Sequence, residues 1–241
     1  MDIDKLLKDM GVNITYRCNK GCYHCALRRD VKGWFDQMTL DEYKGLFEHI
    51  DGSDIPKIKQ WCISGGEPFL HKDIIEIIEF TKKMLPDAKI LVITNGSLID
   101  KFVEHAKDNV YYRISTYPGY NDAIIEKHKA SPNILTYPFY GFFDAYATQN
   151  RNDTDAKKLY RACGNKWLRF TGTRLYECCN SEMMERLFNI DNVSFEFADD
   201  WKIKLEKLET WKACKRCYKT SNYSKIKKTV GLPKKHSVEA N

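Results

Sequence analysis

Residues 16–25 of the 241-residue chain read Tyr-Arg-Cys-Asn-Lys-Gly-Cys-Tyr-His-Cys, and this stretch sets the expectation for the whole fold. It places Cys18, Cys22 and Cys25 in one short segment that also contains Gly21. A structural zinc ion normally takes four protein ligands in a closed tetrahedron, whereas three thiolates around an iron–sulfur cube leave one iron with an open position. The spacing therefore predicts a metal centre that is able to bind a further ligand.

The composition is that of a globular chain with a substantial core. Hydrophobic residues make up 43% of the sequence, with 13 glycines and 7 prolines. Lys and Arg outnumber Asp and Glu by 39 to 33, a formal charge of +6. Because residues 215–235 hold many bases and no acid, the excess lies mainly in a basic tail, and a nucleic-acid partner is not implied. Residues 221–241 are expected to be flexible.

The sequence shows no targeting or membrane segment. No run of about 18 apolar residues occurs, and residues 1–5 lack the apolar stretch of a signal peptide. We therefore expect a cytoplasmic protein without a membrane partner. In such a chain, the nine cysteines are more typical of metal binding than of disulfides.

Strand-like and helix-like segments alternate along the first part of the chain. A capping box at Thr39–Glu42 predicts a helix towards Ile50, and residues 73–85 predict another that ends before Pro86. This order predicts an α/β fold with a mostly parallel sheet, whose carboxyl-end loops meet at one rim. A sixth strand is expected within residues 141–148. Because the apolar segment there is short, a fold truncated by the loss of this strand remains an alternative. The other strands are expected at residues 12–16, 58–63, 89–94, 110–115 and 134–137.

The pattern changes in the last third of the chain. Residues 166–178 predict a β-hairpin around Gly172. Asp200 is expected to cap a helix that runs from Trp201 towards Trp211 and delivers Cys214 and Cys217.

Three features together resemble the radical S-adenosylmethionine (radical SAM) enzymes. The C-x3-C-x2-C spacing is similar to their cluster signature, and the segment 64–68, Ser-Gly-Gly-Glu-Pro, is similar to their GGEP motif. The later cysteines resemble the twitch or SPASM auxiliary-cluster extension. The resemblance runs from about Val12 to about Cys217. It implies a partial (β/α)6 TIM-like barrel over residues 1–150, a small hairpin-plus-helix twitch-like domain over 151–220, and the tail.

The resemblance also implies two cofactor sites and their residues. The first is a [4Fe–4S] cluster with S-adenosyl-L-methionine (SAM), held by Cys18, Cys22 and Cys25. SAM contacts are expected near His24 for the adenine and in the 65–67 loop for the amino group, and further along the chain for the carboxylate or ribose. The expected residues of these contacts are His24, Gly65, Gly66, Glu67, Asn95 and Ser115. The second site is an auxiliary [4Fe–4S] cluster on Cys163, Cys178, Cys214 and Cys217.

Simpler interpretations of the same residues remain open. The first three cysteines fit a zinc site with His24 or His71 as the fourth ligand. The four cysteines of the second site fit a zinc ion bound by four thiolates. Cys178 and Cys179 point to opposite sides of an extended chain, so at most one is expected to bind a given cluster.

Other residues are interpreted as packing. Gly-Gly and Asn-Gly pairs are also common in plain turns. Cys62 lies in an apolar strand and is expected to be an inert buried thiol. Aromatic residues near the strand ends are expected either to pack or to line a substrate pocket, namely Tyr117, Tyr137, Phe139, Tyr140 and Phe142.

The resemblance implies reductive cleavage of SAM to a 5′-deoxyadenosyl radical, which takes hydrogen from a small polar metabolite such as a sugar, cyclitol or nucleoside derivative. The outcome is dehydrogenation or epimerisation, with help from the auxiliary cluster and with electrons from an external donor such as flavodoxin or ferredoxin. The alternatives are a radical SAM maturase that modifies a peptide or protein, and a zinc-stabilised binding module.

Overall fold

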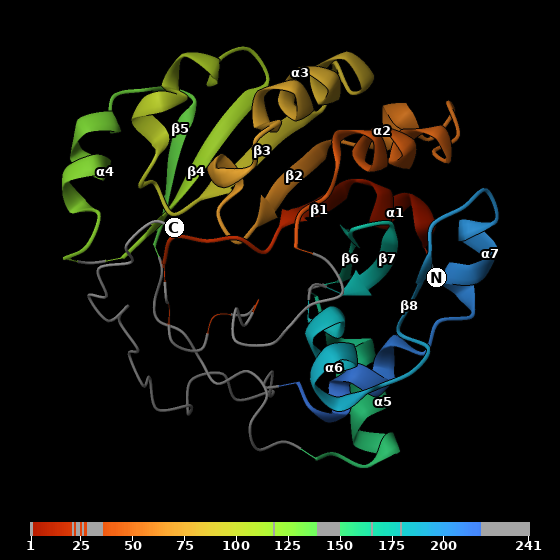
Figure 1. Ribbon diagram of the computed structural model, residues 1–241. Coiled ribbons are helices and arrows are strands. Elements are labelled where there is room, and N and C mark those ends of the chain that lie inside the picture. Colours follow the sequence, from red (N-terminus) through yellow and green to blue (C-terminus); the bar gives the residue numbers. More distant parts are fainter. Residues whose placement is uncertain are drawn as a thin grey trace.

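The structure is a computed structural model that describes residues 2–20, 22, 25, 27, 36–117, 119–138, 150–164, 166–178 and 180–217. Its centre is an eight-stranded sheet of order β5-β4-β3-β2-β1-β6-β7-β8 (Figure 1). The strands β1 to β6 pair in parallel, whereas β7 and β8 are antiparallel additions at one edge. The strand bounds are β1 (Asp9–Thr15), β2 (Gln60–Gly65), β3 (Lys89–Thr94), β4 (Val110–Thr116), β5 (Ile134–Pro138), β6 (Lys166–Thr171), β7 (Arg174–Cys178) and β8 (Ser194–Glu196).

Helices connect the parallel strands, as crossover connections require. The α-helices are α1 (Ile3–Leu7), α2 (Leu40–Glu48), α3 (Ile74–Met84), α4 (Asp122–His128), α5 (Asp153–Ala162), α6 (Ser181–Phe188) and α7 (Trp201–Glu206). Short 3-10 helices are η1 (Ile55–Lys57), η2 (Pro68–Leu70), η3 (Ile99–Lys101), η4 (Val103–His105) and η5 (Thr210–Lys215). No helix in the described ranges is long and apolar enough to cross a membrane.

The five strands expected from the sequence and the alternation of strand and helix are confirmed, and β3 has the expected bounds. The capping box before α2 is confirmed in full. The Thr39 hydroxyl accepts the Glu42 N–H at 3.2 Å, and the Glu42 carboxylate accepts the Thr39 N–H at 2.7 Å. The sixth strand expected within residues 141–148 lies outside the described residues.

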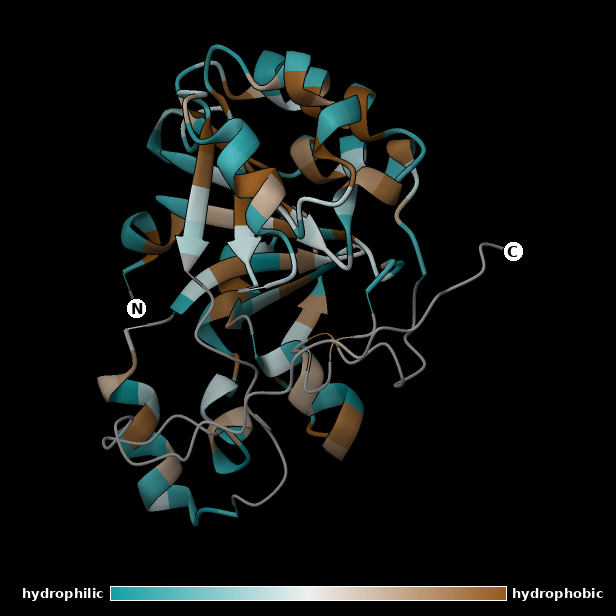
Figure 2. Ribbon diagram, turned by 90° about the vertical axis from the view of Figure 1, so that its left-hand side faces the viewer, coloured by the Kyte–Doolittle hydropathy of each residue, from teal (hydrophilic) through white to brown (hydrophobic). Residues whose placement is uncertain are grey.

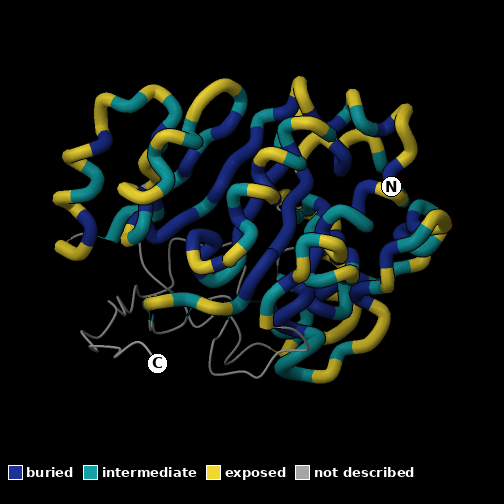
Figure 3. The backbone as a smooth tube through the Cα atoms, turned by 45° about the horizontal axis from the view of Figure 1, so that its top comes forward, coloured by how far each residue is buried: buried dark blue, intermediate teal, exposed yellow. Residues whose placement is uncertain are grey.

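One face of the sheet packs against α2 and α3 and forms the main core (Figure 3). The Trp61 indole is fully buried there and donates to the Tyr43 hydroxyl at 2.9 Å, and that hydroxyl lies 2.6 Å from the Thr81 hydroxyl. Because each buried polar group has a partner, the aromatic layer costs little in desolvation. Hydrophobic and hydrophilic residues alternate along these helices, as expected when one side faces a core (Figure 2).

The opposite face, called the inner face below, carries the residues that alternate with the core positions, among them Asn13, Cys62, Ser64, Arg113 and Arg169. Strand alternation and the register place them there, since Val12 pairs with Ile63 and Asn13 with Ser64. The inner face is more polar than the core face.

The last third of the chain differs from the sequence expectation in three ways. The hairpin is confirmed, with Gly172 at a φ of 55°, but its first strand, β6, pairs in parallel with β1 and so extends the parallel sheet. Asp200 makes no side-chain cap, and its carboxylate binds Lys204 at 2.7 Å. The predicted helix begins at Trp201 as expected, but its extension towards Trp211 is wrong, because α7 ends at Glu206 and the separate η5 carries Cys214.

Candidate active site

The three-cysteine segment leaves the carboxyl end of β1 as a loop that is closed at its base. The Tyr16 N–H donates to the Asp36 carbonyl at 2.8 Å, and the Met38 N–H donates to the Ile14 carbonyl at the same distance. The Arg17 guanidinium adds an ion pair with the Asp36 carboxylate at 2.6 Å. Both ends of the loop are therefore anchored to the strand.

The thiol groups of Cys18, Cys22 and Cys25 are partly buried and close enough to influence one another. Burial raises the pKa of Cys22 to about 12, and the nearby Cys25 and Cys18 add to the rise. Thiolates so close together repel each other, and bound iron would offset this repulsion. In the described part of the chain, no three Cys, His, Asp or Glu side chains are grouped as ligands of one metal ion.

His71, the distant histidine of the zinc alternative, is committed elsewhere. Its Nε2 lies 2.7 Å from the Met38 carbonyl oxygen, and its Nδ1 accepts the Asp73 N–H at 3.1 Å. Burial lowers the pKa of His71, so the neutral ring that these bonds require is favoured. Both ring nitrogens are thus occupied by backbone groups, and neither is available to a metal.

The two glycines after β2 let this loop pass directly against the chain that enters the cysteine segment. The Gly66 N–H donates to the Thr15 carbonyl at 2.7 Å, and the Glu67 N–H donates to the Arg17 carbonyl at 2.8 Å. A Cβ atom on Gly65 would lie 2.2 Å from the Thr15 oxygen, and one on Gly66 would lie 2.2 Å from the Arg17 oxygen. The pair is therefore required for a close approach between two backbone segments.

The Glu67 side chain is fully buried and ties this loop to the end of β3. Its carboxylate accepts the Thr94 hydroxyl and the Asn95 N–H, both at 2.8 Å, and the Phe69 N–H at 3.2 Å. Burial raises the pKa of Glu67, and these donors oppose the rise. The contacts that the structure gives this carboxylate are internal, and a direct contact with the SAM amino group stays a prediction.

Asn95 and Ser115 lie at the same rim as the cysteines. The Asn95 amide donates to the Asn19 side chain at 2.9 Å and lies 4.0 Å from the Cys18 sulfur. Asn121, which the sequence did not single out, donates to the carbonyls of Asn95 at 3.1 Å and Ser115 at 2.8 Å. The only sequence signal for Asn121 is an asparagine directly before α4.

The four later cysteines that the sequence proposed as a second site lie on separate elements of the last third of the chain. Cys163 caps the end of α5, Cys178 ends β7, Cys214 lies in η5, and Cys217 follows η5. Burial raises the pKa of Cys214 to about 12, with Cys217 and Cys163 as the next causes. Asn180 donates through its N–H to the Cys178 sulfur at 3.5 Å and through its amide to the Cys217 sulfur at 3.9 Å.

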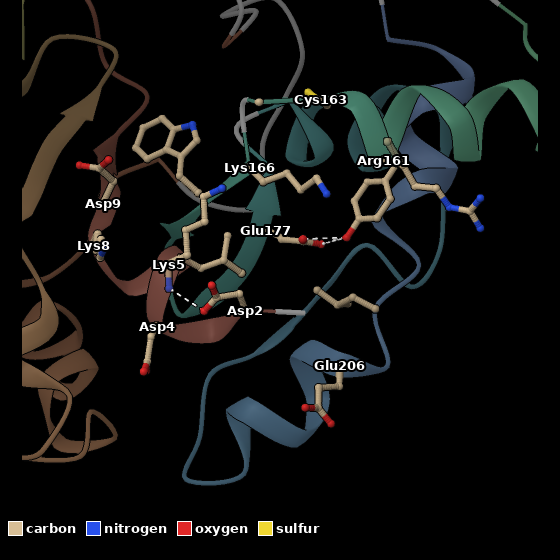
Figure 4. Close-up of a pocket in the computed structure, with 15 residues that line it drawn as sticks. Asp2, Asp4, Lys5, Lys8, Asp9, Arg161, Cys163, Lys166, Glu177 and Glu206 are labelled. Atoms are coloured by element: carbon tan, nitrogen blue, oxygen red, sulfur yellow. Dashed lines mark hydrogen bonds between the residues drawn. The ribbon is translucent and has the colours of Figure 1, made fainter.

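A groove of about 1000 Å³ opens beside Cys163, between α1, α5 and the start of β6 (Figure 4). The Tyr160 hydroxyl points at the buried Glu177 carboxylate in its wall and lies 2.7 and 2.8 Å from the two carboxylate oxygens. Asp9 and Lys166, the first residues of β1 and β6, also line this groove. It therefore lies at the amino ends of these strands, opposite the rim that carries the cysteine loop.

A buried polar network joins α6 to the inner face. The Glu182 carboxylate accepts from the Asn13 amide at 3.0 Å and the Thr171 hydroxyl at 2.8 Å, and it pairs with Arg186 at 3.3 Å. Burial raises the pKa of Glu182 to about 7, and Arg186 opposes the rise. The Arg186 guanidinium lies 4.6 Å from the Tyr16 ring, directly before the cysteine loop. This network was not found from the sequence.

Several expected site residues lie outside the described ranges, namely His24, Phe139, Tyr140, Phe142 and Cys179. Burial raises the pKa of Tyr117, and the charges of Cys22, Cys25 and Cys18 add to the rise. Tyr117 therefore lies near the first three thiols. Cys62 is buried on the inner face, and Tyr137 is exposed.

Comparison with known proteins identifies the class of this fold. Residues 12–129 match the model of the Radical SAM superfamily. GTP 3′,8-cyclase from Aliarcobacter butzleri is 32% identical over 104 residues, which cover 43% of this chain and 32% of that protein. Fe-coproporphyrin III synthase from Methanosarcina barkeri is 32% identical over 90 residues, which cover 37% of this chain and 21% of that protein. The chain thus spans at most about a third of the length of these relatives.

Among solved structures, BtrN in complex with AdoMet and 2-DOIA has a TM-score of 0.60 at 15% identity, covering 90% of this chain and 95% of BtrN. Native anSMEcpe with bound AdoMet has a TM-score of 0.57 at 12% identity, covering 91% and 86%. These likenesses show the fold. Residues 12–129 form a radical SAM domain, so this part of the recognition and the fold class expected from the sequence are confirmed, while the twitch-like extension stays a prediction. The family implies a [4Fe–4S] cluster and SAM, and three soft thiolates in one loop fit such a cluster.

Proposed function

We propose that this chain is a radical SAM enzyme that dehydrogenates or epimerises a small polar metabolite, such as a sugar, cyclitol or nucleoside derivative. The observation that carries the proposal is the rim at the carboxyl ends of β1 to β4. There the cysteine loop, the Gly65–Gly66 loop, Asn95 and Ser115 are joined by direct hydrogen bonds or through Asn121. When bound, the cluster and SAM supply a one-electron cleavage that yields methionine and a 5′-deoxyadenosyl radical.

The residues of the rim have distinct roles in this proposal. Cys18, Cys22 and Cys25 hold the cluster. Gly65 and Gly66 keep their loop against the base of the cysteine segment, and Glu67 fixes the end of β3 to that loop. Because the loops are linked to one another, the ligands they hold are pre-positioned, and such positioning is a large part of catalysis. The partly buried Tyr117 helps to exclude water from the thiols.

Cys163, Cys178, Cys214 and Cys217 are proposed to hold an auxiliary [4Fe–4S] cluster. Dehydrogenation of an alcohol removes two electrons and two protons from the substrate. SAM cleavage accounts for one hydrogen atom, so the second electron requires another redox centre, and the second proton passes to a base or to water. Cys214 lies near Cys217 and Cys163, which supports these thiols as ligands of that centre. An all-cysteine set leaves no open iron.

The preference for a small polar metabolite rests on the likeness to BtrN, whose crystal structure contains AdoMet and 2-DOIA. The one-electron donor is proposed to be a flavodoxin or a ferredoxin. Cytoplasmic localisation is part of this proposal, since iron–sulfur thiolates persist in a reducing compartment.

The test is SAM cleavage by anaerobically reconstituted protein with dithionite. The variant with Cys18, Cys22 and Cys25 all changed to Ala should form no 5′-deoxyadenosine, and it should keep part of its iron on the later cysteines. The Cys62→Ala variant is the matched control, because it removes a thiol away from both sets, and it should cleave SAM at the normal rate. Undiminished cleavage by the triple variant would refute the assignment.

A further inference from the structure

Two arginines project from adjacent rows of the inner face below the rim. Arg113 lies on β4, two residues before Ser115, so it stands about 7 Å further down the strand. In the register of the sheet, Arg113 pairs with Ile93, and Cys62 pairs with Leu91. Extension of the same register places Ile93 level with Ser64, so Arg113 and Ser64 share one row.

Arg169 reaches the same row from the other side of the sheet. It lies on β6, where its backbone is level with Gly11. Its guanidinium extends upward and donates to the Ser64 hydroxyl. The guanidinium also lies 4.6 Å from the Trp167 ring, which supports it from one side. Arg113 is held in a similar way, 4.9 Å from the Tyr137 ring.

Both arginines act on the same interior position. The Cys62 thiol is buried, and burial raises its pKa, while Arg169 and Arg113 are the two largest opposing charges. The two guanidiniums therefore both lie near Cys62. They come from β4 and β6, which β3, β2 and β1 separate in the sheet.

Arg113 lacks an anionic partner within the described residues. Its Nε is buried without a hydrogen-bond acceptor, and no carboxylate in the described ranges forms an ion pair with it. Glu182, a buried carboxylate next to the inner face, already pairs with Arg186. Arg113 is partly buried, and its Nε without an acceptor costs free energy that a bound anion would offset.

We propose that Arg113 and Arg169 form a binding site for an oxyanion of the substrate, either a phosphate ester or a carboxylate. The site rests on the proposed function, since that function places the substrate under the rim, and it narrows the substrate to an anionic polar metabolite. A guanidinium presents parallel N–H donors that match both kinds of oxyanion. Two of them, held by aromatic rings on separate strands, would orient the substrate relative to the rim.

The experiment is calorimetric titration of the anaerobically reconstituted full chain with inorganic phosphate and, separately, with acetate. At least one probe should bind saturably at one site. Arg113→Gln and Arg169→Gln should each weaken this binding by about 10- to 100-fold, the loss expected for a charge-assisted hydrogen bond. Arg113→Lys, which keeps the charge, should lose less than Arg113→Gln. Stronger binding of phosphate assigns a phosphate ester, and stronger binding of acetate assigns a carboxylate.

Arg161→Gln is the matched control, because Arg161 is exposed, lines the groove at the amino ends of the strands, and loses the same charge. Its anion affinity should equal that of the unchanged protein. Circular dichroism and iron content confirm that each variant is folded. The proposal is overturned if neither probe binds, if all variants bind equally, or if only Arg161→Gln weakens binding. SAM cleavage is measured separately. A protein that binds the anion through both arginines but does not cleave SAM would refute the proposed function and leave the anion site supported.

Discussion

Gly66→Ala isolates the close contact between the loop after β2 and the cysteine segment. A Cβ atom at this position would lie 2.2 Å from the Arg17 carbonyl oxygen and 2.8 Å from the Tyr16 oxygen, both of which are backbone atoms. Ordinary contacts begin at 3.4 Å, so the two segments must separate by about 1 Å. Gly66 does not have a positive φ, so the effect is steric and does not arise from an unfavourable backbone conformation.

The expected loss follows from the hydrogen bonds that this separation breaks. The Gly66 and Glu67 N–H groups donate across the contact at 2.7 and 2.8 Å. Leaving two such donors unsatisfied costs about 2–4 kcal/mol. For a chain of this size the apparent Tm should fall by about 5–15 °C. A shift of about 1 Å at the rim should also slow SAM cleavage by about 100-fold.

The assay pairs thermal unfolding by circular dichroism with 5′-deoxyadenosine formation under dithionite. Gly45→Ala is the matched control, because Gly45 lies inside α2 and an added Cβ atom there meets nothing within 4 Å. Alanine should stabilise this helix by about 0.5–1 kcal/mol and raise the Tm by a few degrees. Equal behaviour of the two variants, or an unchanged Tm and rate for Gly66→Ala, would refute the steric argument.

Three further predictions concern the buried groups. Burial raises the pKa of Glu182 from 4.5 to about 7, so its protonation stabilises the fold below pH 4.5, and this contribution is lost as the pH rises through 7. Glu182→Gln should remove that pH dependence from the Tm. The same dependence of Tm on pH in the variant and the unchanged protein would contradict this prediction. Cys178→Ala should lower iron content more than Cys179→Ala or Cys62→Ala. A larger loss of iron in Cys179→Ala would assign the ligand to Cys179. His71→Asn should lower the Tm without loss of iron, since both ring nitrogens bind backbone groups. Iron loss in a folded variant would make His71 a ligand of the metal centre.

The sequence predicted those parts of the fold that depend on neighbouring residues. The capping box at Thr39 and the β-branched run of β3 depend on local periodicity and end signals, so both were found. The pairing of β6 with β1 was missed, because it joins residues far apart in the chain and leaves no local pattern. Asp200 has the right residue type for a cap, but its carboxylate pairs with Lys204 instead.

The candidate site divides in the same way. The spacing of Cys18, Cys22 and Cys25 and the Gly-Gly pair lie within short segments, so the sequence by itself determined the family and the position of the rim. Only the tertiary structure decided that Glu67 ties two loops together and that Arg113 and Arg169 lie on adjacent rows of the inner face. The physical reason is that a side chain's partners depend on strand register and burial, which arise from contacts between distant parts of the chain.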